Sequence, residues 1–300
     1  MRVLSTPETL NFMTISLPDL PSELTIRDLR PTDGAAGLRL STVANWNQTA
    51  VDWDFLLGHG WGRGISCDGL IVATAVVLRY PPGIGWIGMV LVDPEWRKMG
   101  LATRLMHEAV AYCENSGLVP GLDSTPEGQQ VYKRLGFIDG GELVRMRRIE
   151  KRGDLAKSGG RESDMGPGEA GIAWDREGFG YDRSILLNWM ETTCPDLCVG
   201  RSGPDGSLEA AAWGRRGRTA VQVGPVLARS PDTARSFLAD IFGSEETTWV
   251  IDVPVRRSKF IGWLYGQGFE VERSFTRMMR GRFGIDFRNE RFAVAGPDLG

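Results

Sequence analysis

One segment, residues 90–103, constrains this chain more than any other, and it reads VLVDPEWRKMGLAT. An apolar stretch at residues 84–92 is typical of a strand, and a helical pattern begins at Gly100 after a short basic loop. Amide groups at a helix N-terminus lack partners within the helix and lie at the positive end of its dipole. Gly100 has no Cβ, so a ligand can approach the backbone closely. The segment therefore predicts an anion site that fits a pyrophosphate; for this loop alone, the alternative is an ordinary strand-to-helix turn.

Side chains around Gly100 support the anion site. Arg97 and Lys98 add positive charge, and Ala102 keeps the position after the helix start small. The pattern R-x-x-G-x-A over residues 97–102 resembles the acetyl-CoA loop of the GNAT superfamily. Farther along, residues 132–137 read YKRLGF and resemble the family's Y-x-x-x-G-F element. Because the two motifs occur in the family's order, the chain is identified as resembling a GNAT N-acetyltransferase.

The resemblance implies acetyl-CoA as co-substrate, without a metal. It also implies the fold class, which is α/β (α+β) with a mixed central sheet flanked by helices. Family members often have Asn where this chain has Thr125, and Ala where it has Gly128. The change at Thr125 removes one expected hydrogen bond to the cofactor. The implied cofactor-binding residues are Val90, Leu91, Val92, Arg97, Lys98, Met99, Gly100, Leu101, Ala102, Thr103, Thr125 and Gly128.

Acetyl transfer to nitrogen needs a neutral amine, an oxyanion donor and an acid for the leaving thiolate. Most alkylamines are protonated at pH 7, as the Lys pKa of about 10.4 shows, so a base or a desolvating pocket must remove a proton. The resemblance implies oxyanion donors on the backbone of residues 90–92 and Tyr132 as the catalytic acid. The alternative for Tyr132 is a packing tyrosine that only hydrogen-bonds the sulfur.

The predicted reaction is therefore direct attack on acetyl-CoA by a small-molecule primary amine in a ternary complex, which makes the chain an acyltransferase. Two alternative functions stay open. One is a non-catalytic acyl-CoA-binding protein or sensor, and the other is a protein or peptide acetylase. The identity of the acceptor amine does not follow from the motifs.

The general base does not follow from the motifs either. Relatives often place a Glu on the strand that holds the oxyanion donor, but residues 84–92 contain no ionisable side chain. The candidates are Asp123, Asp52 and Asp252, each with the alternative of a cap or surface carboxylate, and a water relay is also open. Acceptor contacts are expected from Trp46, Asn47 and Trp53, because aromatic walls with few polar anchors suit small ligands; a core tryptophan pair is the alternative.

The two halves of the chain resemble a degenerate internal repeat. Residues 122–137 and 251–269 each run from a strand end through a Pro-containing turn and a helix to Gly-Phe. The narrower resemblance rests on residues 46–49 (WNQT), 52–53 (DW), 179–184 (FGYDRS), 224–225 (GP) and 276–278 (TRM). On these residues the whole chain is similar to two-lobed GNAT proteins of the YitH/HpsE type. The expected organisation is an arm (1–23), a catalytic GNAT domain (24–148), a charged Gly-rich linker (149–170), a degenerate GNAT-like domain (171–281) and a tail (282–300). The second domain lacks the acetyl-CoA loop at residues 228–232, so we expect no chemistry there.

Composition narrows the remaining classes. The formal net charge of −3 argues against a nucleic-acid footprint, and no apolar run reaches the length of a membrane span. The N-terminal residues lack a signal-peptide pattern, so a cytoplasmic location is expected. Four cysteines without a CxxC pair and two histidines make a metal site unexpected. The oligomeric state stays open.

Periodicity and turn residues predict the individual elements. Helices are expected at 33–46, 49–57, 100–115, 126–135, 182–193, 232–242 and 257–266. Strands are expected at 24–30, 61–67, 70–79, 84–92, 118–123, 137–147, 208–214, 219–226, 248–253 and 269–279.

Overall fold

The computed structural model describes residues 20–149, 166–244, 246–281 and 290–300. The predicted arm, linker and tail therefore lie partly outside the described residues. The strands are β1 (Leu24–Asp28), β2 (Trp61–Cys67), β3 (Leu70–Tyr80), β4 (Ile84–Val92), β5 (Val119–Ser124), β6 (Ile138–Arg148), β7 (Val199–Ser202), β8 (Leu208–Arg216), β9 (Val221–Ala228), β10 (Trp249–Pro254), β11 (Glu270–Met279) and β12 (Arg291–Ala293). The helices are α1 (Gly34–Val43), α2 (Ala50–His59), α3 (Leu101–Asn115), α4 (Pro126–Arg134), α5 (Gly168–Phe179), α6 (Ser184–Thr193), α7 (Pro231–Gly243) and α8 (Ser258–Gly266), with short 3-10 turns between some of them.

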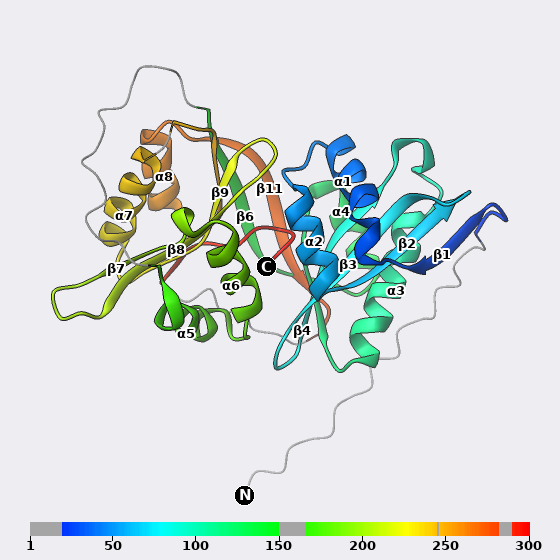
Figure 1. Cartoon of the computed structure of the whole chain (residues 1–300), viewed down its shortest axis with the longest axis horizontal. Coiled ribbons are helices and arrows are strands. Elements are labelled where there is room, and N and C mark those ends of the chain that lie inside the picture. The colour runs from blue at the N-terminus through cyan, green and yellow to red at the C-terminus, as the bar shows by residue number, and fades with distance from the viewer. Residues whose placement is uncertain (1–19, 150–165, 245, 282–289) are drawn as a thin grey trace, which may run out of the picture.

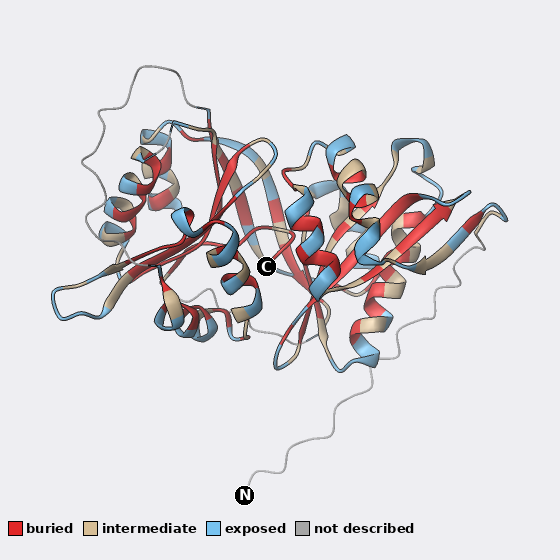
Figure 2. Cartoon of the chain, viewed as in Figure 1, coloured by how far each residue is buried: buried red, intermediate tan, exposed pale blue. Residues whose placement is uncertain are grey.

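The described strands join in one 12-stranded sheet, in the order β1-β2-β3-β4-β5-β11-β6-β10-β9-β8-β7, with β12 paired to β9. We call β1–β5 with α1–α4 the first lobe, and β7–β10 with α5–α8 the second lobe. Figure 1 shows the two lobes side by side, with β6 and β11 between them. Buried residues follow the strands and the helix faces turned toward the sheet (Figure 2). The predicted mixed α/β fold is confirmed.

The helices of the first lobe follow from local sequence. Thr49 caps α2: its side chain accepts a hydrogen bond from the Asp52 amide, and the Asp52 carboxylate accepts one from the Thr49 amide, which is a capping box. One face of α3 is apolar and buried, with Leu101, Leu105 and Ala109 at most 1% exposed. Helices with one apolar face pack that face on the sheet.

The two lobes exchange their last strands. β6, which follows the first lobe in sequence, pairs with β10 of the second lobe, while β11 pairs with β5 of the first. β6 and β11 pair with each other in antiparallel fashion at the centre. The linker predicted at 149–170 therefore does not separate two sheets, because the described strands before and after it belong to one sheet.

Two buried ion pairs fasten this exchange. Arg277 on β11 donates two hydrogen bonds of 2.8 Å to Asp123 on β5. Arg145 on β6 donates two of 2.8 Å to Asp252 on β10. In each pair the two residues are register partners on neighbouring strands, so the two contacts are equivalent. We call them the exchange ion pairs.

The predicted helices and strands are present with small shifts at their ends, but three elements were missed: α5, β7 and β12. α5 begins at Gly168, inside the segment predicted as a linker. Its buried face carries Asp175, which pairs with the buried Arg183 at 2.7 Å, and a charged residue hides an apolar stripe. β7 and β12 have only four and three residues, too few for alternation to stand out.

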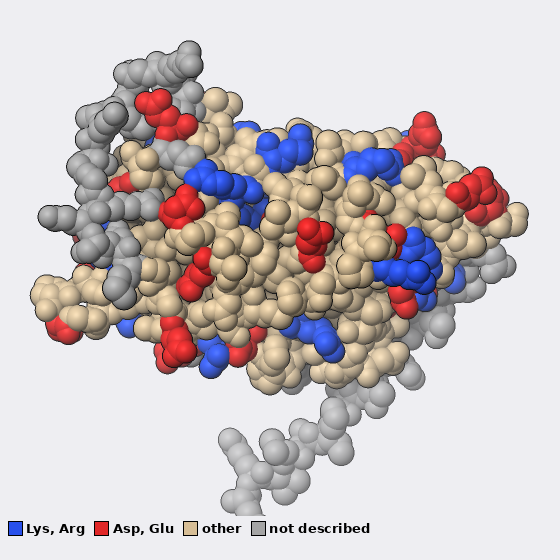
Figure 3. Space-filling model, in the orientation of Figure 1, with Lys and Arg blue, Asp and Glu red and all other residues tan. Residues whose placement is uncertain are grey.

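The surface and the cysteines add little to the site. On the face shown in Figure 3, basic and acidic side chains form separate small groups. Cys67, Cys113, Cys194 and Cys198 are free thiols. Among the described residues, no group of three or more His, Cys, Asp or Glu side chains could hold a metal ion. Within the same residues, no helix is both long and apolar enough to cross a membrane.

Candidate active site

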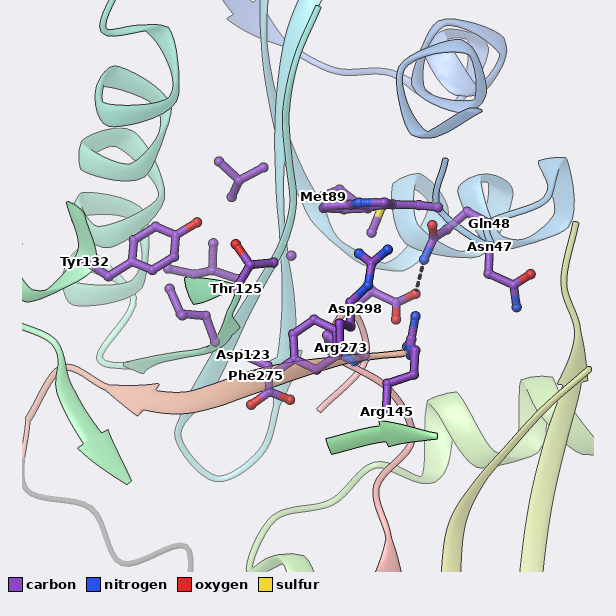
Figure 4. Close-up of a pocket in the computed structure, with 16 residues that line it drawn as sticks. Asn47, Gln48, Met89, Asp123, Thr125, Tyr132, Arg145, Arg273, Phe275 and Asp298 are labelled. Carbon is purple, nitrogen blue, oxygen red and sulfur yellow. Dashed lines mark hydrogen bonds between the residues drawn. The ribbon is translucent and has the colours of Figure 1, made fainter. Parts of the chain in front are cut away.

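The site lies where β4 and β5 diverge. The two strands are parallel, and they pair only where Ile84–Trp86 of β4 lie beside Val119–Gly121 of β5. Beyond this point they open around a cavity of about 120 Å³, shown in Figure 4. Its walls come from the first lobe, from the exchanged strands β6 and β11, and from the C-terminal segment: Trp46, Asn47, Gln48, Ile87, Gly88, Met89, Val90, Leu122, Asp123, Thr125, Tyr132, Arg145, Arg273, Phe275, Pro297 and Asp298.

A bulge in β4 shapes the cavity wall. Thr74 of β3 pairs with Leu91 and Val76 with Gly88, so β4 carries one extra residue. Met89 has a positive φ of 52°, and its carbonyl accepts a hydrogen bond from the Thr74 hydroxyl at 2.9 Å. A bulge turns the strand and redirects its peptide groups. Of the three predicted oxyanion positions, Val90 lines the cavity, whereas Leu91 and Val92 are not among its lining residues.

The basic loop leads into α3 as predicted. Gly100 is the N-cap of α3 with φ 79°, and no side chain caps the helix. Lys98 also has a positive φ of 65°, so the loop turns sharply twice. Among the described residues, no hydrogen-bond acceptor is found for the amides of residues 98–103. Free amides at the positive end of a 15-residue helix fit the phosphates of a pyrophosphate.

Contacts behind the loop hold it in place. Arg39 pairs with Asp93, the first residue after β4, and this hydrogen bond is the main cause that lowers the pKa of the Asp93 carboxyl. Arg97 donates from Nε to the Val92 carbonyl at 3.2 Å. Because these anchors lie on the strand side, the loop amides face outward.

Tyr132 reaches the cavity from α4, on the side opposite Asp298 in Figure 4. Burial raises the pKa of its phenol to about 12, so the hydroxyl is protonated at physiological pH. Its ring lies against Gly128, where a Cβ would come within 2.8 Å of the Tyr132 ring. The glycine that departs from the family pattern therefore makes room for this tyrosine. Thr125 caps α4 by accepting a hydrogen bond from the Gly128 amide.

The predicted acceptor-side residues separate into two groups. Trp46 and Asn47 line the cavity. Asn47 is also a bridge between the lobes, because its Nδ2 donates to the Ala220 carbonyl at 3.0 Å and its Oδ1 accepts from the Thr219 amide at 2.8 Å. Trp53 lies elsewhere: its side chain is fully buried, and its Nε1 donates to the Ser41 hydroxyl at 3.1 Å. Trp53 is a core residue between α1 and α2.

Each carboxylate considered as a base is held in a buried ion pair. Asp123 and Asp252 belong to the exchange ion pairs, and of the two only Asp123 lines the cavity. Burial raises the pKa of Asp123, and Arg277 opposes that shift. Asp52 accepts from Arg215 at 2.9 Å with one oxygen and caps α2 with the other. Asp52 is a helix cap, as the alternative interpretation had it, although it is buried. Asp123 and Asp252 are neither caps nor surface carboxylates.

Comparison with known proteins settles the family. A model described as Acetyltransferase (GNAT) family matches residues 35–137, and one described as Acetyltransferase (GNAT) domain matches residues 172–292. The chain belongs to the GNAT acetyltransferases. One GNAT domain lies in each half, as the internal repeat predicted.

Two curated relatives span much of the chain. Holothin acyltransferase of Pseudoalteromonas sp. (strain SANK 73390) is 28% identical over 282 residues, which cover 90% of this chain and 94% of that protein. The uncharacterized N-acetyltransferase YitH of Bacillus subtilis (strain 168) is 25% identical over 216 residues, covering 70% and 72%. Family membership and these relatives identify the GNAT chain as an acyltransferase.

Solved structures share the two-lobed GNAT fold. A putative acetyltransferase from Pyrococcus horikoshii superposes with a TM-score of 0.74 at 17% identity, covering 94% of this chain and 98% of its own. A tandem GNAT protein from the clavulanic acid biosynthesis pathway gives 0.61 at 13% identity, covering 87% and 100%. At these identities the likeness concerns the fold.

Sequence reasoning missed several residues of this GNAT site. Gln48, Arg145, Arg273, Phe275 and Asp298 line the cavity, and none was predicted. Arg145, Arg273 and Phe275 reach it only because β6 and β11 are exchanged. Asp298 lies in a Gly-Pro-Asp sequence near the C-terminus, which signals a turn and nothing more. Of these residues, only Gln48 could have been predicted from sequence, because it directly follows Asn47.

Proposed function

We propose that this GNAT protein is an acetyl-CoA-dependent N-acetyltransferase that moves an acetyl group to a small-molecule primary amine by direct attack in a ternary complex. The observation that carries the proposal is the divergence of β4 from β5, with the protonated hydroxyl of Tyr132 facing the cavity between them. We infer that residues 24–148 carry the chemistry and that residues 171–281 form the degenerate domain.

Acetyl-CoA fits this half of the molecule for two reasons. The free amides of residues 98–103 and the charges of Arg97 and Lys98 suit the pyrophosphate. Tyr132 and Val90 both line the cavity between β4 and β5, where the thioester would lie. A backbone amide at the β4 bulge would stabilise the oxyanion. The small volume of the cavity, about 120 Å³, favours a small amine over a protein or peptide.

The roles of the chain's own groups follow. Tyr132 gives its proton to the departing thiolate, and the amine's proton leaves on the opposite side of the thioester carbonyl. With the pKa of Tyr132 raised to about 12, the phenol stays protonated throughout pH 6–10. Its titration should therefore place no fall in activity within that range.

Replacing Tyr132 tests this function. We expect Tyr132→Phe to lower kcat about 100-fold, at the low end for general acid catalysis, because a thiolate is a fair leaving group without help. Acetyl-CoA affinity should change by less than about twofold, since the ring is kept and only a transition-state contact is lost. The measurement is thiol release from acetyl-CoA with a panel of primary amines, together with calorimetry.

Tyr112→Phe is the matched control, because Tyr112 does not line the cavity. Its ring stacks on Trp61, with 4.5 Å between the ring centroids. A Tyr132→Phe kcat within about twofold of the parent would remove the acid role. Binding of acetyl-CoA without turnover of any amine would instead favour a non-catalytic acyl-CoA sensor.

A further inference from the structure

The C-terminal segment crosses from the second lobe into the active site of the first. β12 pairs with β9, and Figure 1 shows the segment ending between the two lobes. Two buried aromatic side chains of the first lobe then hold it. Trp86 donates to the Pro297 carbonyl at 3.0 Å, and Tyr80 donates to the Leu299 carbonyl at 2.8 Å. Asp298, between these two anchors, is thereby fixed in the cavity wall.

One oxygen of Asp298 is engaged and the other is not. Oδ2 accepts from Gln48 Nε2 at 2.8 Å and from Arg215 Nη2 at 3.1 Å. Oδ1 makes no hydrogen bond among the described residues, although the side chain is only 4% exposed and lines the cavity. Asp298 Oδ1 is thus open to a donor in the cavity, and beside it Gln48 Oε1 is a buried acceptor without a donor, which is uncommon in folded proteins.

The charges of this buried network are also unequal. The exchange ion pairs each join one carboxylate to one guanidinium. Arg215, however, serves two carboxylates, Asp52 and Asp298. Asp52 is satisfied at both oxygens, because its second oxygen accepts from the Thr49 amide and hydroxyl. Asp298 thus has only a share of one guanidinium, while Arg273 of β11, which also lines the cavity, makes no ion pair with it among the described residues.

From this arrangement, and resting on the proposed N-acetyltransferase function, we propose that Asp298 is a catalytic residue that binds the ammonium group of the acceptor and takes its proton. A primary alkylamine enters the cavity as a cation, because its pKa is near 10. Such an ammonium supplies a hydrogen-bond donor and a positive charge at Oδ1. β4 offers no ionisable side chain for this purpose, whereas Asp298 lies across the cavity from Tyr132 (Figure 4).

The protons and electrons of the transfer then balance. Asp298 takes one proton from the ammonium, and the freed lone pair forms the N–C bond to the thioester carbonyl carbon. The C–S bond breaks with its electron pair on sulfur, and the thiolate takes the Tyr132 proton. The second nitrogen proton is lost from the adduct and restores Tyr132 through solvent. One proton is released overall, from Asp298. Gln48 and Arg215 act as positioning residues for the carboxylate.

The inference also defines the class of acceptor. A buried carboxylate at the nitrogen selects amines that are protonated at pH 7, such as n-butylamine, benzylamine and 2-phenylethylamine. An arylamine such as aniline is neutral at this pH, so it gains nothing from the negative charge and needs no base before it attacks. Alkylamines should accordingly be preferred by the parent protein.

Asp298→Asn tests the proposal, because it keeps the size and an acceptor for Gln48 but removes the charge. At pH 7 we expect kcat/KM for benzylamine to fall about 100-fold, within the range for general base catalysis, with acetyl-CoA affinity unchanged within about twofold. The loss should shrink as the pH approaches the pKa of the amine, about 10, because the neutral amine then forms without a base. The measurement is thiol release from acetyl-CoA between pH 6 and 10.

Asp52→Asn is the matched control, since it removes the other carboxylate from Arg215 without lining the cavity. Its effect on kcat/KM should be the same at every pH. An Asp298→Asn loss that is equally independent of pH, or a kcat/KM within about twofold of the parent, would overturn the proposal. In either case Asp298 would serve only the structure.

A binding measurement separates this inference from the proposed function. Calorimetry with benzylamine as probe and CoA present should show binding to the parent and at least tenfold weaker binding to Asp298→Asn. If the parent releases no thiol with any amine, the proposed function fails by itself, and the probe still decides about Asp298. Equal binding to both proteins, or binding to neither, would overturn the ammonium site.

Discussion

The two lobes contain the same strand opening, which lines a cavity in the first lobe and is entered by another described segment of the chain in the second. In the second lobe, β9 pairs with β10 only over Val221–Val223. Its bulge falls at the equivalent place: Ala212 of β8 pairs with Val226 and Gly214 with Val223. Beyond this point the chain itself enters the gap. β12 pairs with β9, and the Val294 amide donates to the Asp252 carbonyl at 3.0 Å.

The helices that follow the two bulged strands differ in how their N-terminal amides are capped. α3 begins at Gly100 with no side-chain cap, so its amides are left for a ligand. α7 begins after Ser230, whose hydroxyl accepts from the Thr233 amide at 3.1 Å, so the chain satisfies its own helix end. The second lobe has thus filled with its own atoms both places where the first lobe would hold acetyl-CoA.

The comparison shows how a repeated domain can change its use. The second lobe keeps the strand order and the bulge, but its gap receives the C-terminal segment on its way to Asp298. Gly224 permits this close approach, because it has φ 154° and a Cβ there would lie 1.9 Å from the Val294 carbonyl oxygen. We propose that the second lobe supports the active site of the first.

The largest expected effect is a loss of stability when one of the two exchange ion pairs is broken. Asp123→Asn and Asp252→Asn each break one exchange ion pair and leave a buried arginine without its counter-charge. We expect each to lower the free energy of unfolding by about 3–5 kcal/mol, and by similar amounts because the two geometries match. Urea unfolding followed by circular dichroism measures this. A loss confined to one variant would show that the two exchanged strands are not equivalent.

The next largest effect is on acetyl-CoA affinity, and we expect it only for a change in the loop of the first lobe. Gly100→Glu should weaken acetyl-CoA binding at least 100-fold, about 2.8 kcal/mol, because it places a negative charge against the pyrophosphate. Gly206→Glu is a close control: Gly206 has the same φ of 79°, with nothing near its Cβ position, and lies in the β7–β8 hairpin. Both variants carry similar backbone strain, so equal calorimetric affinities would remove the loop from the site.

The smallest expected effect is on the second lobe. Ser230→Gly opens the cap of α7 and gives this helix the same N-cap residue as α3. We still expect one acetyl-CoA per chain by calorimetry, because β12 continues to fill the gap between β9 and β10. The parent should show the same stoichiometry. A second site in the variant would mean that the cap, and not the C-terminal segment, closes the second lobe.

Much of the local structure could be predicted from the sequence. The helix stripe of α3, the capping box of α2 and the strand-to-helix turn at Gly100 depend on residues close together in the chain. The two motifs also placed acetyl-CoA and Tyr132 in the first lobe, and these assignments stay predictions. By contrast, α5 was missed because its buried face includes Asp175, whose partner Arg183 can be paired with it only in three dimensions.

What the sequence determined by itself was the family, the mixed α/β fold, the repeat and the loop at residues 97–103, because each depends on short-range patterns or on motifs in a fixed order. The tertiary structure alone decided the strand exchange, the buried pairing of Asp123 and Asp252, and the position of Asp298. These contacts join residues more than a hundred positions apart, as Gln48 and Asp298 do. Periodicity carries no record of such pairings, because it reports which face of an element is buried and not what covers it.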